Sequence, residues 1–146
     1  MILVNCYAPY TGKIDFWNNV MESGLLLEQG LIFYGDLNFT ISQTKVWGRD
    51  ARVDDMADYF SHMLMQFKLV DILPRKLSPT WRNGRKGDKG IGKRLGIFLV
   101  SEDLFEKLGR FKSWVKGVEI FDHCPACFQF VVDDMVRKYL YKFNHV

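Results

Sequence analysis

The stretch from Leu31 to Asn38, with the sequence LIFYGDLN, places the strongest constraint on the fold. Its four consecutive apolar or aromatic residues are typical of a short strand that is covered on both faces. Gly35 then permits a tight backbone path, and Asp36 and Asn38 follow with one residue between them. On an extended backbone this spacing directs a carboxylate and a carboxamide to the same side, at a strand end where α/β proteins commonly bind ligands. The alternative is a plain strand end, because Gly, Asp and Asn are also common turn residues.

A strand–helix–strand order leads into this stretch. Ile2–Ala8 has the composition of a strand, and Lys13–Gln29 has apolar residues at helical spacing. This order implies two parallel strands joined by a right-handed crossover. Tyr7 then falls at the same edge of the sheet as Asp36 and Asn38. We therefore expect an α/β fold with a polar site at that edge.

The rest of the chain alternates between strand-like and helical patterns. The clearest helical pattern runs from Met56 to Phe67, and we expect Asp54 and Asp55 to occupy the first turn of that helix. Ser101 is expected to cap a short helix over residues 102–108. The remaining expected elements are strands near residues 69–73, 79–82, 93–100, 111–115, 117–120 and 127–132.

Length and composition limit the possible classes of protein. The 146 residues suffice for one domain, and 48% hydrophobic with 25% charged residues is typical of a soluble globular chain. No stretch is apolar enough to span a membrane, and the N-terminus lacks the pattern of a signal peptide. Three cysteines, an odd number, favour reduced thiols in an intracellular protein of the nucleus or cytoplasm. The net charge of only +3 means that any affinity for nucleic acid must come from a local patch.

A second polar cluster lies at Asp122 and His123, between two strand patterns. A histidine titrates near neutral pH, so His123 could transfer a proton or, when charged, bind an anion. The alternative is a structural histidine.

The spacing of Cys124 and Cys127 is that of redox motifs, but those open a helix, whereas a strand pattern follows here. A zinc site would need four ligands and only His123 is close by, so neither redox chemistry nor zinc binding is favoured.

A basic, glycine-containing segment follows Trp81, and we expect it to be a mobile hairpin. It carries six cations and a single carboxylate, that of Asp88. Cations beside an aromatic side chain suit contact with a phosphate backbone. The alternative is a solvated surface loop. The candidate nucleic-acid-binding residues are Trp81, Arg82, Arg85, Lys86, Lys89, Lys93 and Arg94.

Five motifs, taken in order, resemble those of the endonuclease/exonuclease/phosphatase superfamily, which has the DNase-I-like fold. The motifs are a Tyr-x-Pro strand end at residues 4–9, Gly-Asp-Leu-Asn at 35–38, Pro-Thr-Trp at 79–81, an Arg-Leu strand at 93–101 and Asp-His-Cys-Pro at 122–125. Within the superfamily the chain looks most like the endonuclease domain of LINE-type, non-LTR retrotransposons. The Thr-Trp-x-Asn hairpin, the Lys-Arg-Leu strand and the Tyr-x-Phe-Asn-His at 141–145 carry that closer likeness.

The resemblance implies a role for each candidate residue. Asp36 would orient or deprotonate the attacking water, and Asn38 would hold the phosphate and help to fix Asp36. Tyr7 would contact the scissile phosphate. His123 would stabilise the charge of the phosphorane, with Asp122 near a metal ion. The implied reaction is cleavage of a DNA phosphodiester with Mg²⁺ as cofactor.

The resemblance also implies an architecture. The family packs two sheets face to face with helices outside, which makes a four-layer α/β/β/α sandwich. We expect residues 1–132 to form the C-terminal part of such a domain, with its N-terminal strands missing, and residues 133–146 to form a tail. An open edge near residues 1–4 would then favour self-association.

Two departures from the family pattern bear on activity. The metal-binding Glu of the family belongs to the missing N-terminal part. The Asp that orients the catalytic His is Gly96 here, and it is followed by Ile97 rather than Arg. Single losses of such groups lower rates by roughly 10²–10³-fold. We therefore expect a degenerate, inactive endonuclease-like domain of a retroelement; the alternatives are a phosphatase of the same superfamily and a non-catalytic nucleic-acid-binding or inert remnant.

Overall fold

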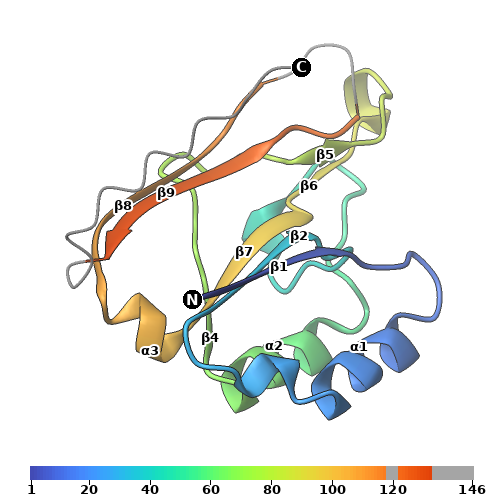
Figure 1. Cartoon of the computed structure of the whole chain (residues 1–146). Coiled ribbons are helices and arrows are strands. Elements are labelled where there is room, and N and C mark those ends of the chain that lie inside the picture. Colours follow the sequence, from blue (N-terminus) through green and yellow to red (C-terminus); the bar gives the residue numbers. More distant parts are fainter. Residues whose placement is uncertain (118–121, 133–146) are drawn as a thin grey trace, which may run out of the picture.

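A computed structural model describes residues 1–117 and 122–132 of the chain (Figure 1). The helices and strands are β1 (Ile2–Tyr7), α1 (Lys13–Glu22), β2 (Leu31–Asp36), β3 (Val46–Trp47), α2 (Ala57–Gln66), β4 (Leu69–Asp71), β5 (Trp81–Arg82), β6 (Gly92–Lys93), β7 (Gly96–Ser101), α3 (Glu102–Phe105), β8 (Leu108–Val115) and β9 (Ala126–Val132). The strand expected near 117–120 falls mostly outside the described residues. So do the tail 133–146 and the motif at 141–145 within it.

A four-stranded sheet in the order β1-β2-β7-β4 forms the centre of the molecule. β1 and β2 are parallel, and β7 is antiparallel to both β2 and β4. The parallel pair confirms the order expected from the strand–helix–strand pattern. The register places Tyr7 opposite Asp36, so the two side chains start from the same edge of the sheet.

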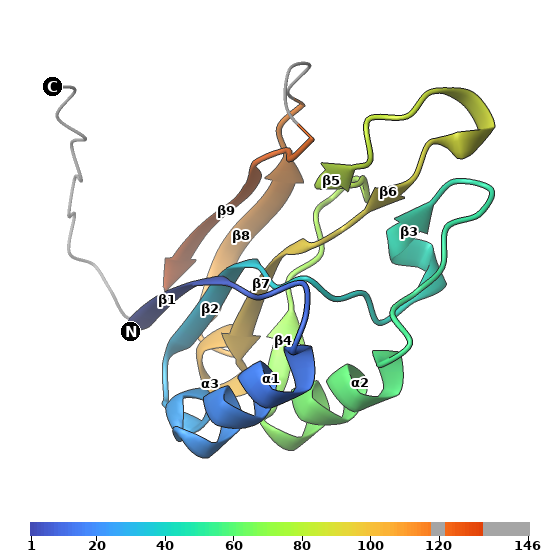
Figure 2. The same cartoon turned by 90° about the vertical axis from the view of Figure 1, so that its right-hand side faces the viewer.

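Each face of this sheet is covered by a different layer. Helices α1 and α2 lie on one face, and the two-stranded ribbon of β8 and β9 lies on the other (Figures 1 and 2). Under the helices, the buried indole of Trp17 packs against Phe33, Phe39 and Phe60. Under the ribbon, a second apolar cluster joins Val100 and Ile72 to the aromatic rings of Phe128 and Phe130 in the ribbon. The described residues thus form an α/β/β arrangement, three layers of the expected sandwich.

A small three-stranded sheet, in the order β3-β6-β5, stands beside the central one, and its loops project from the molecule (Figure 2). The single strand expected near residues 93–100 is divided between β6 in this sheet and β7 in the central sheet. Thr80 explains the division, because its Oγ1 accepts hydrogen bonds from the backbone N–H groups of Leu95 (2.8 Å) and Gly96 (2.7 Å). The N–H of Arg94 is held by the carbonyl of Lys45 at 3.0 Å. These bonds turn the chain from one sheet into the other.

The two long helices are shorter than the sequence predicts. α1 does not reach Gln29, because Gly24 has a left-handed backbone (φ +78°) and a short 3₁₀ turn follows it. α2 begins after Asp54 and Asp55, which therefore do not occupy its first turn. Asp54 instead accepts a hydrogen bond from the backbone N–H of Met56 at 3.2 Å, as a turn residue that leads into the helix.

The expected helix over 102–108 is the single turn α3, and β8 begins where we expected that helix to end. Ser101 precedes α3, but its hydroxyl makes no capping hydrogen bond to the helix. The hydroxyl instead accepts from the backbone N–H of Leu31 at 3.0 Å and so ties β7 to β2. In the part of the chain that the structure describes, no helix has the length and apolar character needed to cross a membrane.

Apolar side chains are exposed along the outer strands. β1 and β9 each pair with one neighbour among the described residues. Met1, Leu3 and Val131 are 61%, 59% and 55% exposed. Self-association through such an edge remains a prediction.

Gly35 marks the closest approach between β1 and β2. Its φ is +134°, and a Cβ at this position would lie 1.9 Å from the carbonyl oxygen of Cys6. We predict that Gly35→Ala lowers the free energy of unfolding by about 3 kcal/mol, because the strands must separate. Urea unfolding measures this loss. Gly84→Ala is the matched control: φ there is +68° with open space around the Cβ, so it should cost only about 1 kcal/mol. Equal losses of unfolding free energy in the two variants would contradict the role given to the close contact at Gly35.

Candidate active site

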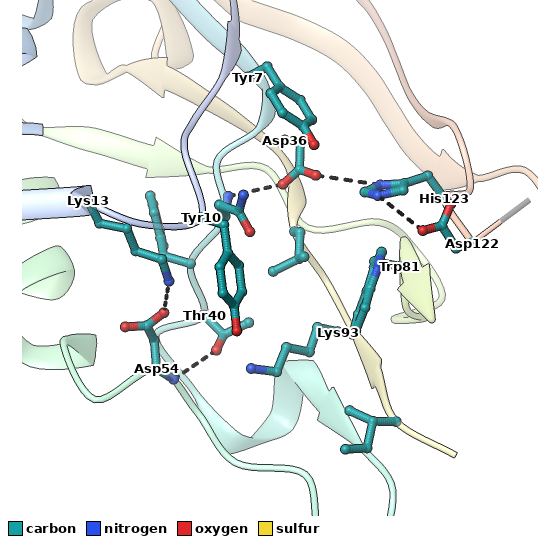
Figure 3. A pocket seen from close by; sticks show the side chains of 14 residues that line it. Tyr7, Tyr10, Lys13, Asp36, Thr40, Asp54, Trp81, Lys93, Asp122 and His123 are labelled. Atoms are coloured by element: carbon teal, nitrogen blue, oxygen red, sulfur yellow. Dashed lines mark hydrogen bonds and ion pairs between the residues drawn. The ribbon is translucent and has the colours of Figure 1, made fainter. Parts of the chain in front are cut away.

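A cavity of about 420 Å³ opens at the edge of the sheet where β1 and β2 end (Figure 3). The structure brings all four catalytic candidates and the candidate metal ligand to this cavity. They come from three separate segments of the chain. These residues are Tyr7, Asp36, Asn38, Asp122 and His123.

Asp36 and Asn38 are held together, but not in the way that the sequence predicts. β2 ends at Asp36, and Asn38 has a left-handed backbone (φ +55°) rather than an extended one. Asn tolerates this conformation better than most residues. The backbone N–H of Asn38 donates to Oδ1 of Asp36 at 3.0 Å, and its side-chain amide donates to the carbonyl of Ala8 at 2.9 Å. Asn38 therefore fixes the carboxylate of Asp36 and ties the end of β2 to the end of β1.

His123 reaches the cavity because residues 122–124 run alongside β5. An antiparallel bridge joins His123 to Trp81. Two backbone hydrogen bonds flank the bridge, at 2.8 and 2.7 Å. Paired residues project to the same side of a sheet, and both side chains line the cavity. The small sheet thus carries His123 to the carboxylate that the central sheet presents.

The imidazole of His123 lies between two carboxylates (Figure 3). Its Nδ1 is 3.5 Å from Oδ2 of Asp36, and its Nε2 is 3.9 Å from Oδ2 of Asp122. Both separations exceed the usual hydrogen-bond range of about 2.7–3.2 Å. The Asp36 side chain is 11% exposed and that of His123 is 44% exposed. Asp36 could accept a proton from water, and a charged His123 could bind a phosphate oxygen.

A smaller cavity of about 180 Å³ lies against His123 at Gly96. Gly96 is paired with Asp36 across β2 and β7. The resemblance implies a carboxylate at Gly96 that orients the histidine, and this chain has a cavity at that place. A Cβ on Gly96 would meet the side chain of Thr80 at 3.4 Å, so the first carbon of a side chain is accommodated there.

The buried thiol of Cys6, close to Asp36, does not supply a nucleophile. Burial, and then the negative charge of Asp36, raises the pKa of the Cys6 thiol to about 11. Cys6 is therefore protonated at neutral pH and unreactive. Cys124 lines the smaller cavity, Cys127 lies in β9, and all three cysteines are free thiols.

The carboxylates at the cavity do not make a complete magnesium site. Asp54 is engaged by Lys13, and Asp36 and Asp122 approach opposite nitrogens of the His123 ring. Among residues 1–117 and 122–132, no three His, Cys, Asp or Glu side chains converge to hold a metal ion. Mg²⁺ can be held by one or two carboxylates only when substrate phosphates and water complete its shell. The described residues thus do not by themselves fit the implied cofactor.

The candidate nucleic-acid-binding residues fall into three groups. Trp81 and Lys93 line the large cavity. Four exposed cations lie on and beside the loop between β5 and β6: Arg82, Arg85, Lys86 and Lys89. The assignment of Arg94 to DNA binding is wrong, because this side chain is only 2% exposed.

Arg94 is part of a buried ionic cluster. Its guanidinium donates to both carboxylate oxygens of Asp71, each at 2.8 Å, and to the carbonyl of Ile72 at 2.9 Å. Lys45 donates to the same carboxylate at 2.7 Å. Asp71 ends β4, Lys45 precedes β3, and Arg94 lies between β6 and β7, so the cluster fastens the small sheet to the central one. A bidentate geometry of this kind is specific to arginine.

Sequence reasoning missed Asn83, which organises the basic loop. Its Oδ1 accepts from the backbone N–H groups of Arg85 (3.2 Å) and Ile91 (3.0 Å). Its side-chain amide donates to the carbonyl of Lys89 at 3.0 Å. We expected a mobile hairpin, but these bonds close the loop into a defined shape. The Asn-Gly pair at 83–84 was the available signal.

Three further residues line the cavity that the sequence analysis did not assign to the site. Tyr10 follows the Tyr-x-Pro strand end and stands over the cavity (Figure 3). Lys13 and Asp54 form an ion pair on its wall across 41 residues of sequence. Tyr10 could have been found from its place after the motif, whereas no local pattern reveals a pair so far apart.

Neither a protein-family model nor a curated protein matches the chain, but solved structures do. The endonuclease domain of TRAS1, a telomere-specific non-LTR retrotransposon, matches with a TM-score of 0.64 and 19% identity over 86% of this chain and 55% of that one. The chain has the DNase-I-like fold. Two structures of NExo from Neisseria share it with the same TM-score: the 3′-5′ exonuclease from Neisseria meningitidis at 18% identity, and a 3′ phosphatase form bound to a product DNA hairpin at 17%.

These likenesses confirm the fold that the five motifs predict. Both NExo comparisons cover 88% of this chain and 60% of theirs. The chain therefore spans between about half and three fifths of the matched DNase-I-like structures.

The cluster at Asp71 predicts how stability depends on charge and pH. Burial raises the pKa of Asp71, but Arg94 and then Lys45 lower it by more, so its pKa lies below its usual value. We predict that Asp71→Asn costs about 3–5 kcal/mol at neutral pH, because two buried cations lose their carboxylate. Because the folded-state pKa is lowered, the stabilisation is present above about pH 4 and is lost as the pH falls through that pKa.

Urea unfolding at neutral and acidic pH measures both effects. The variant should lose the part of the acid sensitivity that Asp71 contributes. Asp88→Asn is the control, because the pair of Asp88 with Arg49 is exposed and should contribute little. A similar small loss in both variants would contradict the role of the buried cluster.

Proposed function

We propose that this chain is a DNA-binding domain of the endonuclease type that engages a backbone phosphate but cleaves it poorly. The observation that carries the proposal is the convergence of Asp36, Asn38 and His123, from separate segments, in one cavity. A proton acceptor, an amide and an imidazole at one point are the groups that a phosphoryl centre needs. Tyr7 is 76% exposed beside them and can contact the same phosphate.

The choice of DNA rests on the loop beside the cavity. Its exposed cations, listed above, form no ion pair within the described ranges. Asn83 gives the loop a defined shape, so these charges are held near the cavity before any ligand binds. Preorganised cations bind a phosphate backbone at a lower entropic cost. The names of the matched structures, a retrotransposon endonuclease and a phosphatase with a DNA hairpin, agree with this choice.

Weak cleavage is proposed from the geometry around the histidine. His123 lies outside hydrogen-bond range of both neighbouring carboxylates, and within residues 1–117 and 122–132 no side chain fills the cavity beside it at Gly96. An imidazole that is not oriented stabilises a transition state poorly. Mg²⁺-dependent activity would need a ligand beyond the carboxylates described above.

A phosphatase that acts on DNA ends is the second candidate. One matched NExo structure is described as a 3′ phosphatase bound to product DNA, and its fold is the one found here. Hydrolysis of a 3′-phosphorylated oligonucleotide without plasmid nicking would favour this candidate. Salt-dependent DNA binding with neither reaction would favour a purely binding role.

We predict that the purified chain with Mg²⁺ retards plasmid DNA but nicks it at least about 10²-fold more slowly than an active endonuclease of this fold, because no carboxylate in the described part of the chain lies within hydrogen-bond range of the histidine. Gel assays of retardation and nicking measure both properties. Asp36→Ala and His123→Ala are assayed alongside. Rapid nicking that disappears in both variants would show a competent site and contradict the proposed weak cleavage.

We also predict that Gly96→Asp raises the nicking rate, by about 10²-fold if the orientation of His123 is the main defect. The added carboxylate would enter the cavity that borders His123. Gly96→Asn is the matched control, since it fills the same space without the charge. Equal rates in the two variants would show that a carboxylate at this position does not limit the reaction.

A further inference from the structure

The central sheet and the ribbon both end in a singly paired strand on the same side of the molecule. β1 is the outer strand of the central sheet, β9 is one of the two strands of the ribbon, and each has one neighbour within residues 1–117 and 122–132. Both strands lie at the front of Figure 1 and at the left of the sheets in Figure 2, with β4 and β8 to their right. The free edges of β1 and β9 therefore form one side face of the molecule.

The two strands of this side face lack the features that keep an exposed edge from pairing. Neither Ile2–Tyr7 nor Ala126–Val132 contains a charged residue, a proline or a glycine. Charges, prolines, bulges and short length are the usual protection of an edge strand. Uncharged segments of six or seven residues that are rich in β-branched and aromatic side chains readily pair with another strand. The side face thus has the composition of a strand-pairing surface.

The opposite edges of the same two sheets are protected. β4 has only three residues and ends at Asp71. β8 carries Arg110 and Lys112, and a register shift interrupts its pairing with β9. A loop also covers part of β8, because the backbone N–H of Arg75 donates to the carbonyl of Ser113 at 3.0 Å. The contrast indicates that one side of the sandwich is built to face solvent and the other to be paired.

The side face is also one strand short of covering the apolar side chains beneath it. Leu3 is paired with Ile32, so both side chains point toward the ribbon. Ile32 is 2% exposed, whereas Leu3 is 59% exposed. The ribbon therefore covers β2 and stops before β1. A strand added to the free edge of β9 would lie about 4.8 Å further out and cover Leu3.

We infer that a second copy of this chain occupies the side face, with β9 paired antiparallel to β9 of the copy about a twofold axis. Antiparallel pairing of a strand with its own copy is self-complementary and closes the assembly at two. An edge without charges permits it, since like charges would otherwise meet across the axis, and offers no pattern that selects a different protein. Edges about 20 Å long, in sheets about 10 Å apart, bury roughly 1,000 Å² in total, enough for a specific interface.

The alternation of side chains along β9 determines the register. Phe128 and Phe130 pack on the core beneath the ribbon, whereas Gln129 and Val131 are exposed. Opposite residues of an antiparallel pair lie on the same face, so a core-facing residue must meet another. Full overlap of the strands places Gln129 opposite Gln129 of the copy, and Phe128 opposite Phe130. The ribbons then merge into one four-stranded sheet, and the same axis brings the two β1 strands toward each other beneath it.

Sedimentation velocity of the purified chain without DNA, over a range of protein concentrations, tests the inference. We expect an equilibrium of monomer and dimer with no larger species, because the twofold pairing leaves no further edge of β9 free. Gln129→Lys and Gln129→Glu each place like charges opposite each other, and each should raise the dimer dissociation constant by about 5-fold. An equimolar mixture of the two variants should dimerise at least as tightly as the unaltered chain, because opposite charges then meet.

Lys112→Glu is the matched control, because it changes a charge on β8, away from the axis, and should leave the dissociation constant within about twofold. Circular dichroism checks that each variant is folded. A monomer at all concentrations, open-ended assemblies, or dimers equally stable in all variants would overturn the inference. Hydrogen exchange identifies the other occupant: protected β9 amides in a monomer would show that another part of the same chain covers the edge. None of these outcomes depends on DNA binding or cleavage.

Discussion

The carboxylate of Asp71 holds the two parts of the site in one geometry. It accepts from both Arg94 and Lys45, and each of these cations belongs to a different connection between the small sheet and the central one. Asp36 ends a strand of the central sheet, and His123 is paired with Trp81 of the small sheet. The separation of these two side chains therefore depends on the cluster, although neither residue contacts it. A buried ion pair adds little net stability compared with an apolar core. The cluster instead fixes how the two sheets are placed relative to each other, because a bidentate guanidinium accepts one orientation of its carboxylate.

A few directional hydrogen bonds also fix the geometry of the rest of the cavity. Thr80 receives two backbone N–H groups on its hydroxyl and one more, from Cys124, on its carbonyl. It thus fixes both the turn from β6 to β7 and the segment that carries His123. Asn38 likewise joins two segments, because its backbone N–H donates to the carboxylate of Asp36 and its side-chain amide donates to the carbonyl of Ala8. Each residue is small, polar and largely withdrawn from solvent, and each joins segments that are distant in the sequence.

Sequence reasoning succeeded where the signal was local and failed where it was not. The parallel pairing that sets Tyr7 beside Asp36 follows from a strand–helix–strand order, which any chain of that pattern must obey. Arg94 looked like its basic neighbours, because its partner Asp71 is 23 residues away and burial cannot be read from composition. The structure has a left-handed backbone instead of the extended one expected at Asn38, whose side chain donates to the carbonyl of Ala8, just after β1. The five motifs were recognisable as a set because their order along the chain survives even where single residues have changed.

The proposed function assigns binding and chemistry to different parts of the site. Binding depends on cations displayed by a loop whose shape Asn83 sets through backbone groups, and such an arrangement tolerates changes in individual side chains. In this proposal catalysis depends on the orientation of one imidazole, and the separations of 3.5 and 3.9 Å place both neighbouring carboxylates of His123 outside hydrogen-bond range. The absence of a carboxylate side chain at Gly96 would therefore weaken cleavage while the fold and the cationic surface stay intact. Under the proposed function, such a domain would lose its chemistry before its affinity for DNA, because affinity is spread over many contacts and orientation is not.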